Sequence, residues 1–245
     1  TPRNLTFKRA VHLWDQAIQS KITTRDNDNN FLNLLRQSHD PKTGYRMTDS
    51  QLRDEINTLF FNGYEDPGAT VTWALYLLGQ HRDANECLKS EVHTVVGDRP
   101  VTVYDLANMP YLDHVINETL RLYPTTWAVM RDAQSDLTLG EYDIKQGAMV
   151  QVTVYLLHRH PDYWEQPNQF KPERFATDYP HNAYMPFGAG ARQCIGRAFT
   201  LMQIKLILVT MLQRYDYVLA SPAVQIDAMA SLRPKNGLPV HLQPL

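Results

Sequence analysis

Cys194 lies in a loop whose composition suits a reactive or metal-binding thiolate. Gly188, Gly190 and Gly196 surround it, and Arg192 adds positive charge. Glycine permits tight turns and a close approach of the backbone. The helix expected directly after the loop points its first peptide N–H groups toward the sulfur, which favours the thiolate over the thiol. The pattern therefore predicts a thiolate ligand to a metal or a nucleophile, and the alternative is a buried structural cysteine in a glycine-rich turn.

The remaining cysteine and the paired histidines give no second metal site. Cys87 lies in an expected helix with no special neighbours, and we interpret it as structural. His158 and His160 stand beside Arg and Pro residues, which is typical of a helix end. With Cys194 as the one thiolate candidate and no paired His–Glu pattern, the sequence does not support a zinc site.

The composition excludes several classes of protein. Of the 245 residues, 43% are hydrophobic and 20% are charged, and the formal net charge is -2. Such a chain is neither disordered nor of low complexity, and it has no basic footprint for nucleic acid. Two cysteines cannot form a disulfide framework, and no apolar run reaches the roughly 20 residues of a membrane span.

The hydrophobic pattern predicts helices first and a small amount of sheet later. The expected helices cover residues 5–22, 31–35, a long helix from about 49 that resumes after Pro67 at 69–78, 85–96, 112–122 and 197–212. Alternating β-branched residues at 137–139 and 149–157 predict strands, as does the Pro-containing tail, whereas 161–186 predicts a loop. The fold class is therefore mostly α with a minor β part, in a single domain over residues 1–245.

The loop at 187–196 resembles the haem-binding signature of cytochrome P-450 enzymes, the haem-thiolate monooxygenases. Its spacing is Phe-x-x-Gly-x-Arg-x-Cys-x-Gly. The resemblance implies that Cys194 is the ligand of the iron in haem b. It also implies that Phe187, Gly188, Arg192 and Gly196 belong to the cofactor-binding loop.

The resemblance covers residues 31–245, which are similar to the C-terminal half of that fold, so the implied fold is a cytochrome P-450 fold lacking its N-terminal helices. Glu118-Thr-Leu-Arg121 is similar to the Glu-x-x-Arg helix of the family, and the segment at 170–175 carries Pro-Glu-Arg174-Phe. Taken alone, Glu118 and Arg121 would form an ordinary pair on a helix surface. The family implies instead that Glu118, Arg121 and Arg174 form a buried triad that locks the loop leading to Cys194.

Two arginines are expected on the haem propionates. Arg131 follows a segment where the family often places such an arginine, and Arg192 is expected to do the same, because guanidinium pairs strongly with carboxylate. The alternative for Arg131 is a solvated strand residue. By the same resemblance, residues 125–129 line the substrate pocket.

The long helix departs from the family where it is expected to cross the haem. The family carries Ala/Gly-Gly-x-Asp/Glu-Thr-Thr there. Gly63 and Glu65 fit that pattern, but Asp66 replaces the first Thr and Pro67 follows it. Pro67 lacks an N–H, so we expect a kink that frees the Gly63 carbonyl. The alternative is that Pro67 ends one helix and begins another.

Gly63, Glu65 and Asp66 are the candidate catalytic residues, and Asp66 leaves two mechanisms open. An ionised Asp accepts hydrogen bonds, and it donates one only if burial raises its pKa enough to keep it protonated. One hypothesis is a proton relay built on acids. The other is a loss of efficient dioxygen cleavage, which favours peroxide as the oxidant or redox-neutral chemistry.

The resemblance implies an oxidoreductase that inserts oxygen into an apolar organic substrate. Electrons would come from a separate ferredoxin or flavin reductase. The alternatives are a peroxygenase, a redox-neutral haem-thiolate enzyme and a non-catalytic haem-binding remnant. Family members are much longer, so we expect a fragment, a remnant or a compact homo-oligomer. We take the cytoplasm as the default location. An N-terminal membrane anchor would not be visible in this sequence.

Overall fold

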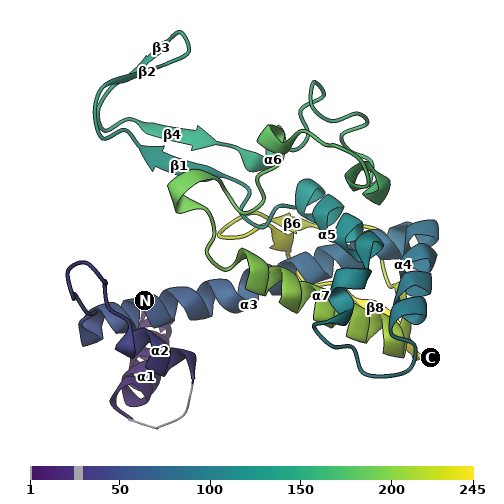
Figure 1. The fold of residues 1–245 in the computed structure, drawn as a ribbon, viewed down its shortest axis with the longest axis horizontal. Coiled ribbons are helices and arrows are strands. Elements are labelled where there is room, and N and C mark those ends of the chain that lie inside the picture. Colours follow the sequence, from purple (N-terminus) through teal and green to yellow (C-terminus); the bar gives the residue numbers. More distant parts are fainter. Residues whose placement is uncertain (1, 25–29) are drawn as a thin grey trace. The chain divides into compact units, whose positions relative to one another are not determined.

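The structure is a computed structural model that describes residues 2–24 and 30–245 (Figure 1). It divides into two compact units, Thr1–Tyr64 and Glu65–Leu245. Helix α3 (Asp49–Gln80) begins in the first unit and ends in the second. The expectation of a single domain over residues 1–245 stays a prediction.

The first unit is a small helical assembly. It contains α1 (Pro2–Thr23), α2 (Phe31–Gln37) and the first part of α3. Its buried core consists of Ile18, Ile22 and Leu52. The side chain of Asn30 caps α2 by accepting a 3.0 Å hydrogen bond from the Asn33 amide, which satisfies one of the free N–H groups at the helix start.

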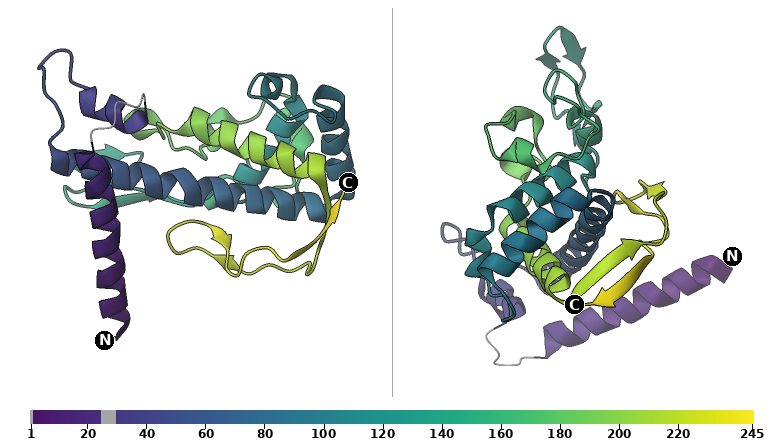
Figure 2. Two further views of the ribbon diagram at one scale, coloured as in Figure 1. Left: turned by 90° about the horizontal axis from the view of Figure 1, so that it is seen from below. Right: turned by 90° about the vertical axis from the view of Figure 1, so that its right-hand side faces the viewer.

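The second unit packs helices around a larger apolar core. Its helices are the rest of α3, α4 (Arg82–Val95), α5 (Pro110–Leu122) and α7 (Arg197–Arg214). Each contributes fully buried side chains, among them Leu78, Leu88, Leu112 and Leu208. The left-hand view in Figure 2 shows α7 running along this unit, where it contacts α4 and α5. The core therefore holds in place the segment that follows Cys194.

Strands form four two-stranded antiparallel sheets in the described chain. The pairs are β1 (Val129–Asp132) with β4 (Met149–Val152), β2 (Leu137–Leu139) with β3 (Tyr142–Ile144), β5 (Tyr215–Leu219) with β8 (Val240–Pro244), and β6 (Ile226–Asp227) with β7 (Arg233–Pro234). In Figure 1, β2 and β3 form the tip of the hairpin that starts with β1 and β4. The predicted fold class, mostly α with a minor β part, is confirmed.

Two sequence-based expectations differ from the structure. The strand expected over residues 149–157 ends at Val152, and α6 (Val154–Leu157) follows it. The Thr153 carbonyl accepts bonds from the amides of residues 156 and 157, so the apolar run closes a helical turn. Helix α3 continues through Pro67, so the alternative in which Pro67 separates two helices is wrong.

The connections between the main elements contain short 3-10 turns. These are η1 (Asp105–Asn108), η2 (Pro172–Phe175), η3 (His181–Ala183) and η4 (Gly190–Arg192). Two of them interrupt the predicted loop at 161–186. None of the helices that the structure describes is long and apolar enough to cross a membrane.

Candidate functional site

The loop before α7 is closed by its own backbone. The amide of Cys194 donates to the Phe187 carbonyl at 2.9 Å, and the Gln193 amide donates to the Gly190 carbonyl at 3.0 Å. Gly188 and Gly190 have φ angles of 69° and 70°, in the left-handed region that side chains disfavour. The two glycines therefore allow the chain to turn twice within ten residues and bring Cys194 back beside Phe187.

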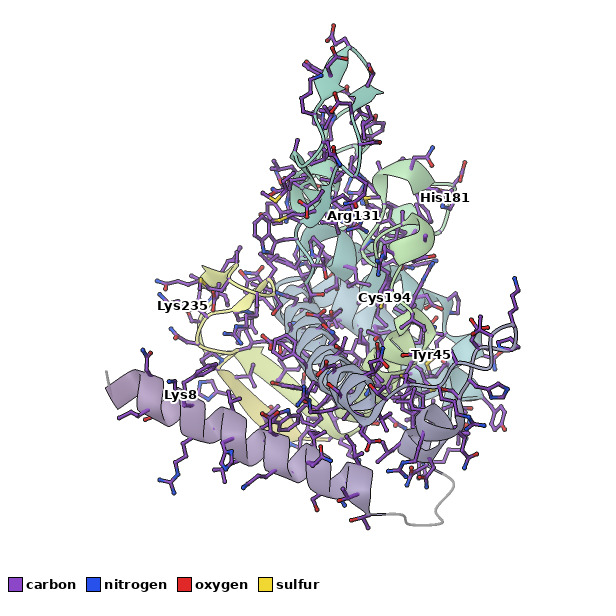
Figure 3. The ribbon with its side chains drawn as sticks, turned by 90° about the vertical axis from the view of Figure 1, so that its left-hand side faces the viewer. Lys8, Tyr45, Arg131, His181, Cys194 and Lys235 are labelled. Carbon is purple, nitrogen blue, oxygen red and sulfur yellow. The ribbon has the colours of Figure 1, made fainter. Side chains whose placement is uncertain are left out.

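The thiol of Cys194 is free and exposed (Figure 3). Gly196 caps α7, and a Cβ added there would lie 3.8 Å from the Cys194 sulfur. Apolar side chains flank the thiol along the chain, with Ile195 95% exposed and Phe199 56% exposed. The loop thus presents a sulfur ligand beside apolar surface at the start of a helix.

A single thiolate suits a metal ion whose other ligands come from a bound macrocycle and not from the protein. No group of three or more His, Cys, Asp and Glu residues in the described parts of the chain could hold a metal ion. An iron porphyrin can be held by one protein ligand such as a cysteine thiolate, and its flat apolar ring would suit the apolar flanks of Cys194. The residues present therefore fit haem.

Arg192 and Arg131 lie on different elements. Arg192 is exposed in η4, next to the cysteine loop, and Arg131 is exposed on β1 (Figure 3). Arg131 donates a 2.7 Å hydrogen bond to the Met130 carbonyl. Within the described residues neither guanidinium has a carboxylate partner, so both are available to an anionic group.

Glu118, Arg121 and Arg174 are in direct contact. Arg121 Nε and Nη2 donate to the two carboxylate oxygens of Glu118 at 2.7 and 2.8 Å. Arg174 Nε and the Lys171 amide donate to Glu118 Oε1 at 3.0 and 2.9 Å. Glu118 and Arg121 are fully buried. Burial of a charged pair is tolerated when every donor and acceptor is satisfied, and this network meets that condition through α5 and η2.

The network reaches the cysteine loop through His158, which sequence reasoning did not identify as a site residue. His158 ends α6, but its buried ring also lies between the Arg121 carbonyl, 3.2 Å from Nδ1, and the Met185 amide, 2.9 Å from Nε2. Burial lowers the pKa of His158 to about 4, so at neutral pH Nδ1–H donates and Nε2 accepts. Met185 stands two residues before Phe187, so His158 joins the triad to the start of the loop.

Asp66 and Glu65 occupy one turn of α3 but have different surroundings. Asp66 is partly buried, its carboxyl makes no hydrogen bond to any described residue, and burial raises its pKa, with a smaller contribution from the charge of Glu65. Glu65 Oε1 accepts from Ser231 Oγ at 3.1 Å and from Arg233 Nη1 at 3.0 Å. Gly63 is half-buried, and no described atom outside its own helix lies within 4 Å of where its Cβ would be.

Three groups therefore hold most of the predicted site residues: the cysteine loop, the Glu118 triad and the acidic turn of α3. His158 joins the first two, and Arg131 stands apart on β1. Ser231 and Arg233 are additional residues that the sequence does not reveal. They lie 166 and 168 positions from Glu65, and no motif or local period marks so distant a pair.

Comparisons with known proteins show the family to which the chain is similar. A family model described as Cytochrome P450 matches residues 6–238. The chain is 34% identical to Cytochrome P450 4V2 of Mus musculus over 96% of this chain and 46% of that protein. It is 34% identical to Cytochrome P450 4g15 of Drosophila melanogaster over 87% of this chain and 39% of that protein. It is 32% identical to a self-sufficient cytochrome P450 monooxygenase, CYP505E3, of Phanerodontia chrysosporium over 96% and 23%. The chain spans less than half the length of each of these relatives.

Proposed function

Because the chain belongs to the cytochrome P450 family, we propose that it binds haem b through the Cys194 thiolate and inserts oxygen into an apolar organic substrate. The observation that carries this proposal is the free, exposed thiol of Cys194 at the start of α7, on a loop that Gly188 and Gly190 shape. The match to the family includes this loop, since it extends over residues 6–238.

Bound haem would supply the redox chemistry, and a thiolate ligand favours O–O cleavage. The protein's part is to bind and orient the ring. We assign Cys194 as the iron ligand, and Phe187, Gly188 and Gly196 as the residues that let the backbone approach it. Arg131 and Arg192, which lack carboxylate partners, are assigned to the propionates.

We propose that Asp66 donates the proton at the position where other members of the family have a Thr hydroxyl. A Thr hydroxyl donates a hydrogen bond at any ordinary pH, whereas a carboxyl donates only when protonated. Burial raises the pKa of Asp66, which favours the protonated, donating form. Asp66→Asn should therefore lower the turnover rate by about a hundredfold, the usual scale of a lost general acid, while Asp66→Thr retains most of it.

The thiolate assignment is tested by the carbon monoxide difference spectrum of the reduced, purified chain. We expect the thiolate signature in the wild type and in Cys87→Ser, which is the matched control because Cys87 is the other free, exposed cysteine. Cys194→Ser should lose the signature. A colourless wild-type chain, or an unchanged spectrum in Cys194→Ser, would contradict the proposal.

A second candidate function, oxidation driven by peroxide, is favoured by Asp66 and Pro67 in place of two hydroxyl residues. It is separated from monooxygenation by comparing turnover with hydrogen peroxide against turnover with dioxygen and a separate ferredoxin or flavin reductase. Coupled NAD(P)H use with Asp66 intact would exclude the peroxide route. Oxidant consumption that depends on an apolar substrate would separate either enzyme from a non-catalytic haem-binding protein.

A further inference from the structure

The side chain of Glu65 is hydrogen-bonded to residues in the C-terminal part of the chain. Its Oε1 accepts hydrogen bonds from Ser231 Oγ and from Arg233 Nη1, at 3.1 and 3.0 Å. The guanidinium of Arg233 is itself held by Asp227, with 3.3 Å between Arg233 Nε and Asp227 Oδ2. Asp227 and Arg233 are paired residues of the β6–β7 ladder, so the cation has a fixed place on a short hairpin.

Buried contacts fix the segment that carries this cation. The Leu232 carbonyl accepts a 2.9 Å hydrogen bond from Trp73 Nε1, and the Leu232 amide donates to the Thr125 carbonyl at 2.9 Å. Trp73 in turn stacks on Tyr123 with ring centroids 3.9 Å apart. Leu232 and Trp73 are buried. An isolated ion pair at the surface contributes little to stability, so the pair with Glu65 would not by itself fix Arg233. The hydrogen bonds of the Leu232 backbone fix the neighbouring residue, and they thereby set the position of Arg233 relative to α3.

The neighbouring acid has no such partner. Asp66 lies one residue along α3, and its partly buried carboxyl makes no hydrogen bond to any residue that the structure describes. Arg233 of the hairpin contacts both Glu65 and Asp227, and the charge of Glu65 contributes to the raised pKa of Asp66. Two adjacent carboxyl groups compete for one proton. A cation on one of them decides the competition, because it stabilises the ionised form of that group.

We propose that Arg233 is a positioning residue that holds Glu65 against the β6–β7 hairpin, so that Asp66 is the carboxyl group that holds the transferable proton at this turn of α3. The inference rests on the proposed function, in which Asp66 is the proton donor. Asp66 releases its proton and takes up another from solvent, while Glu65 stays paired with Arg233. Ser231 supports the same oxygen of Glu65 as a neutral donor.

The direct test is an infrared titration of the protonated carboxyl band in the full, haem-loaded chain, with the Asp66 band assigned by its loss in Asp66→Asn. The wild type should show a single titration. Arg233→Gln should show two overlapping titrations, because Glu65 then competes for the proton. Arg233→Lys retains the cation and should keep a single titration.

A double variant distinguishes positioning from general support of the fold. In Glu65→Gln the competitor and its negative charge are gone, so Asp66 should titrate once and at lower pH. Adding Arg233→Gln to Glu65→Gln should change nothing further in that titration. The pH profile of turnover should follow the same pattern, with Asp66→Asn losing about a hundredfold in rate.

Two outcomes would overturn the inference. One is a wild-type titration that remains single in Arg233→Gln; the other is an Arg233→Gln effect that persists at equal size in the Glu65→Gln background. The infrared titration requires no turnover, so its result is independent of the oxidant and substrate. Failure of the proposed function would appear separately, as a missing thiolate spectrum or missing turnover while the titrations follow the expected pattern.

Discussion

Arg121 uses every N–H of its guanidinium. Besides the two bonds to Glu118, its nitrogens donate to the carbonyls of His158, Pro167 and Gln169 at 2.8, 2.7 and 3.1 Å. The guanidinium also lies 5.1 Å from the Trp164 ring centroid. A planar fork with five donors can reach carboxylate and carbonyl oxygens on several sides at once, and a lysine ammonium has three donors at one point. The residue is therefore determined by geometry as well as charge.

Arg121→Lys should lower the free energy of unfolding by about 2–4 kcal/mol, because buried carbonyl and carboxylate oxygens lose their donors. It should also reduce haem retention, since the network continues through His158 to the cysteine loop. Urea unfolding and the haem-to-protein absorbance ratio measure the two effects. The control is Arg82→Lys, an arginine in an exposed i,i+4 pair with Glu86, which should change neither. A stable, fully haem-loaded Arg121→Lys protein would refute the role of the triad.

At the scale of elements, two of the three glycines of α3 have opposite roles. A Cβ at Gly79 would lie 2.8 Å from Leu219 Cγ on β5, whereas a Cβ at Gly68 would meet nothing within 4 Å. The contact at Gly79 belongs to the packing of β5 along α3 (Figure 2), where the Tyr217 hydroxyl also donates to the Leu75 carbonyl at 2.7 Å. Gly79 therefore permits the close approach of helix and strand.

Gly79→Ala should destabilise the protein by about 1–2 kcal/mol, because the strain of overpacking exceeds the gain in helix propensity. Gly68→Ala, in the same helix, should stabilise it by about 0.5–1 kcal/mol through propensity alone. Urea unfolding measures both. Adding Leu219→Ala should reduce the effect of Gly79→Ala, since it removes the opposing side chain. Equal shifts for the two glycine variants would show that β5 does not press on α3.

The sequence predicts the elements and site residues that depend on neighbours along the chain. Helices α1, α4, α5 and α7 follow from the apolar period, and the cysteine loop is a contiguous motif. The apolar run of α6 misleads, because a run of four apolar residues is too short for its period to distinguish a helical turn from a strand. The pairing of Glu65 with Arg233 could not be predicted, since it depends on how the β6–β7 hairpin reaches α3 from the far end of the chain.

At the scale of the whole molecule, His158 couples stability to pH within the Glu65–Leu245 unit. Its ring joins the end of α5, through the Arg121 carbonyl, to the segment that leads into the cysteine loop, through the Met185 amide. Protonation of Nε2 would remove the acceptor for that amide and would place a second positive charge beside Arg121. The native state therefore requires the neutral ring.

The free energy of unfolding should decrease as the pH is lowered through the range in which His158 titrates. The pKa of His158 in the folded chain is about 4, below the ordinary value of 6.5. Between these two values the unfolded chain binds a proton at this residue and the folded chain does not. Stability is complete above about pH 6.5 and decreases as the pH falls toward 4, with a loss of about 2 kcal/mol between about pH 7.5 and about pH 5. Urea unfolding at a series of pH values measures the slope.

His158→Gln keeps a neutral side chain with a donor and an acceptor but removes the titration. It should flatten the pH dependence between about pH 5 and about pH 7, whatever stability it loses at neutral pH. His160→Gln is the matched control, because His160 is exposed two residues away and its loss should leave the slope unchanged. If His158→Gln kept the full slope of the free energy of unfolding against pH, other groups would cause the acid sensitivity. The neutral ring of His158 would then not be the link between the loop and the triad.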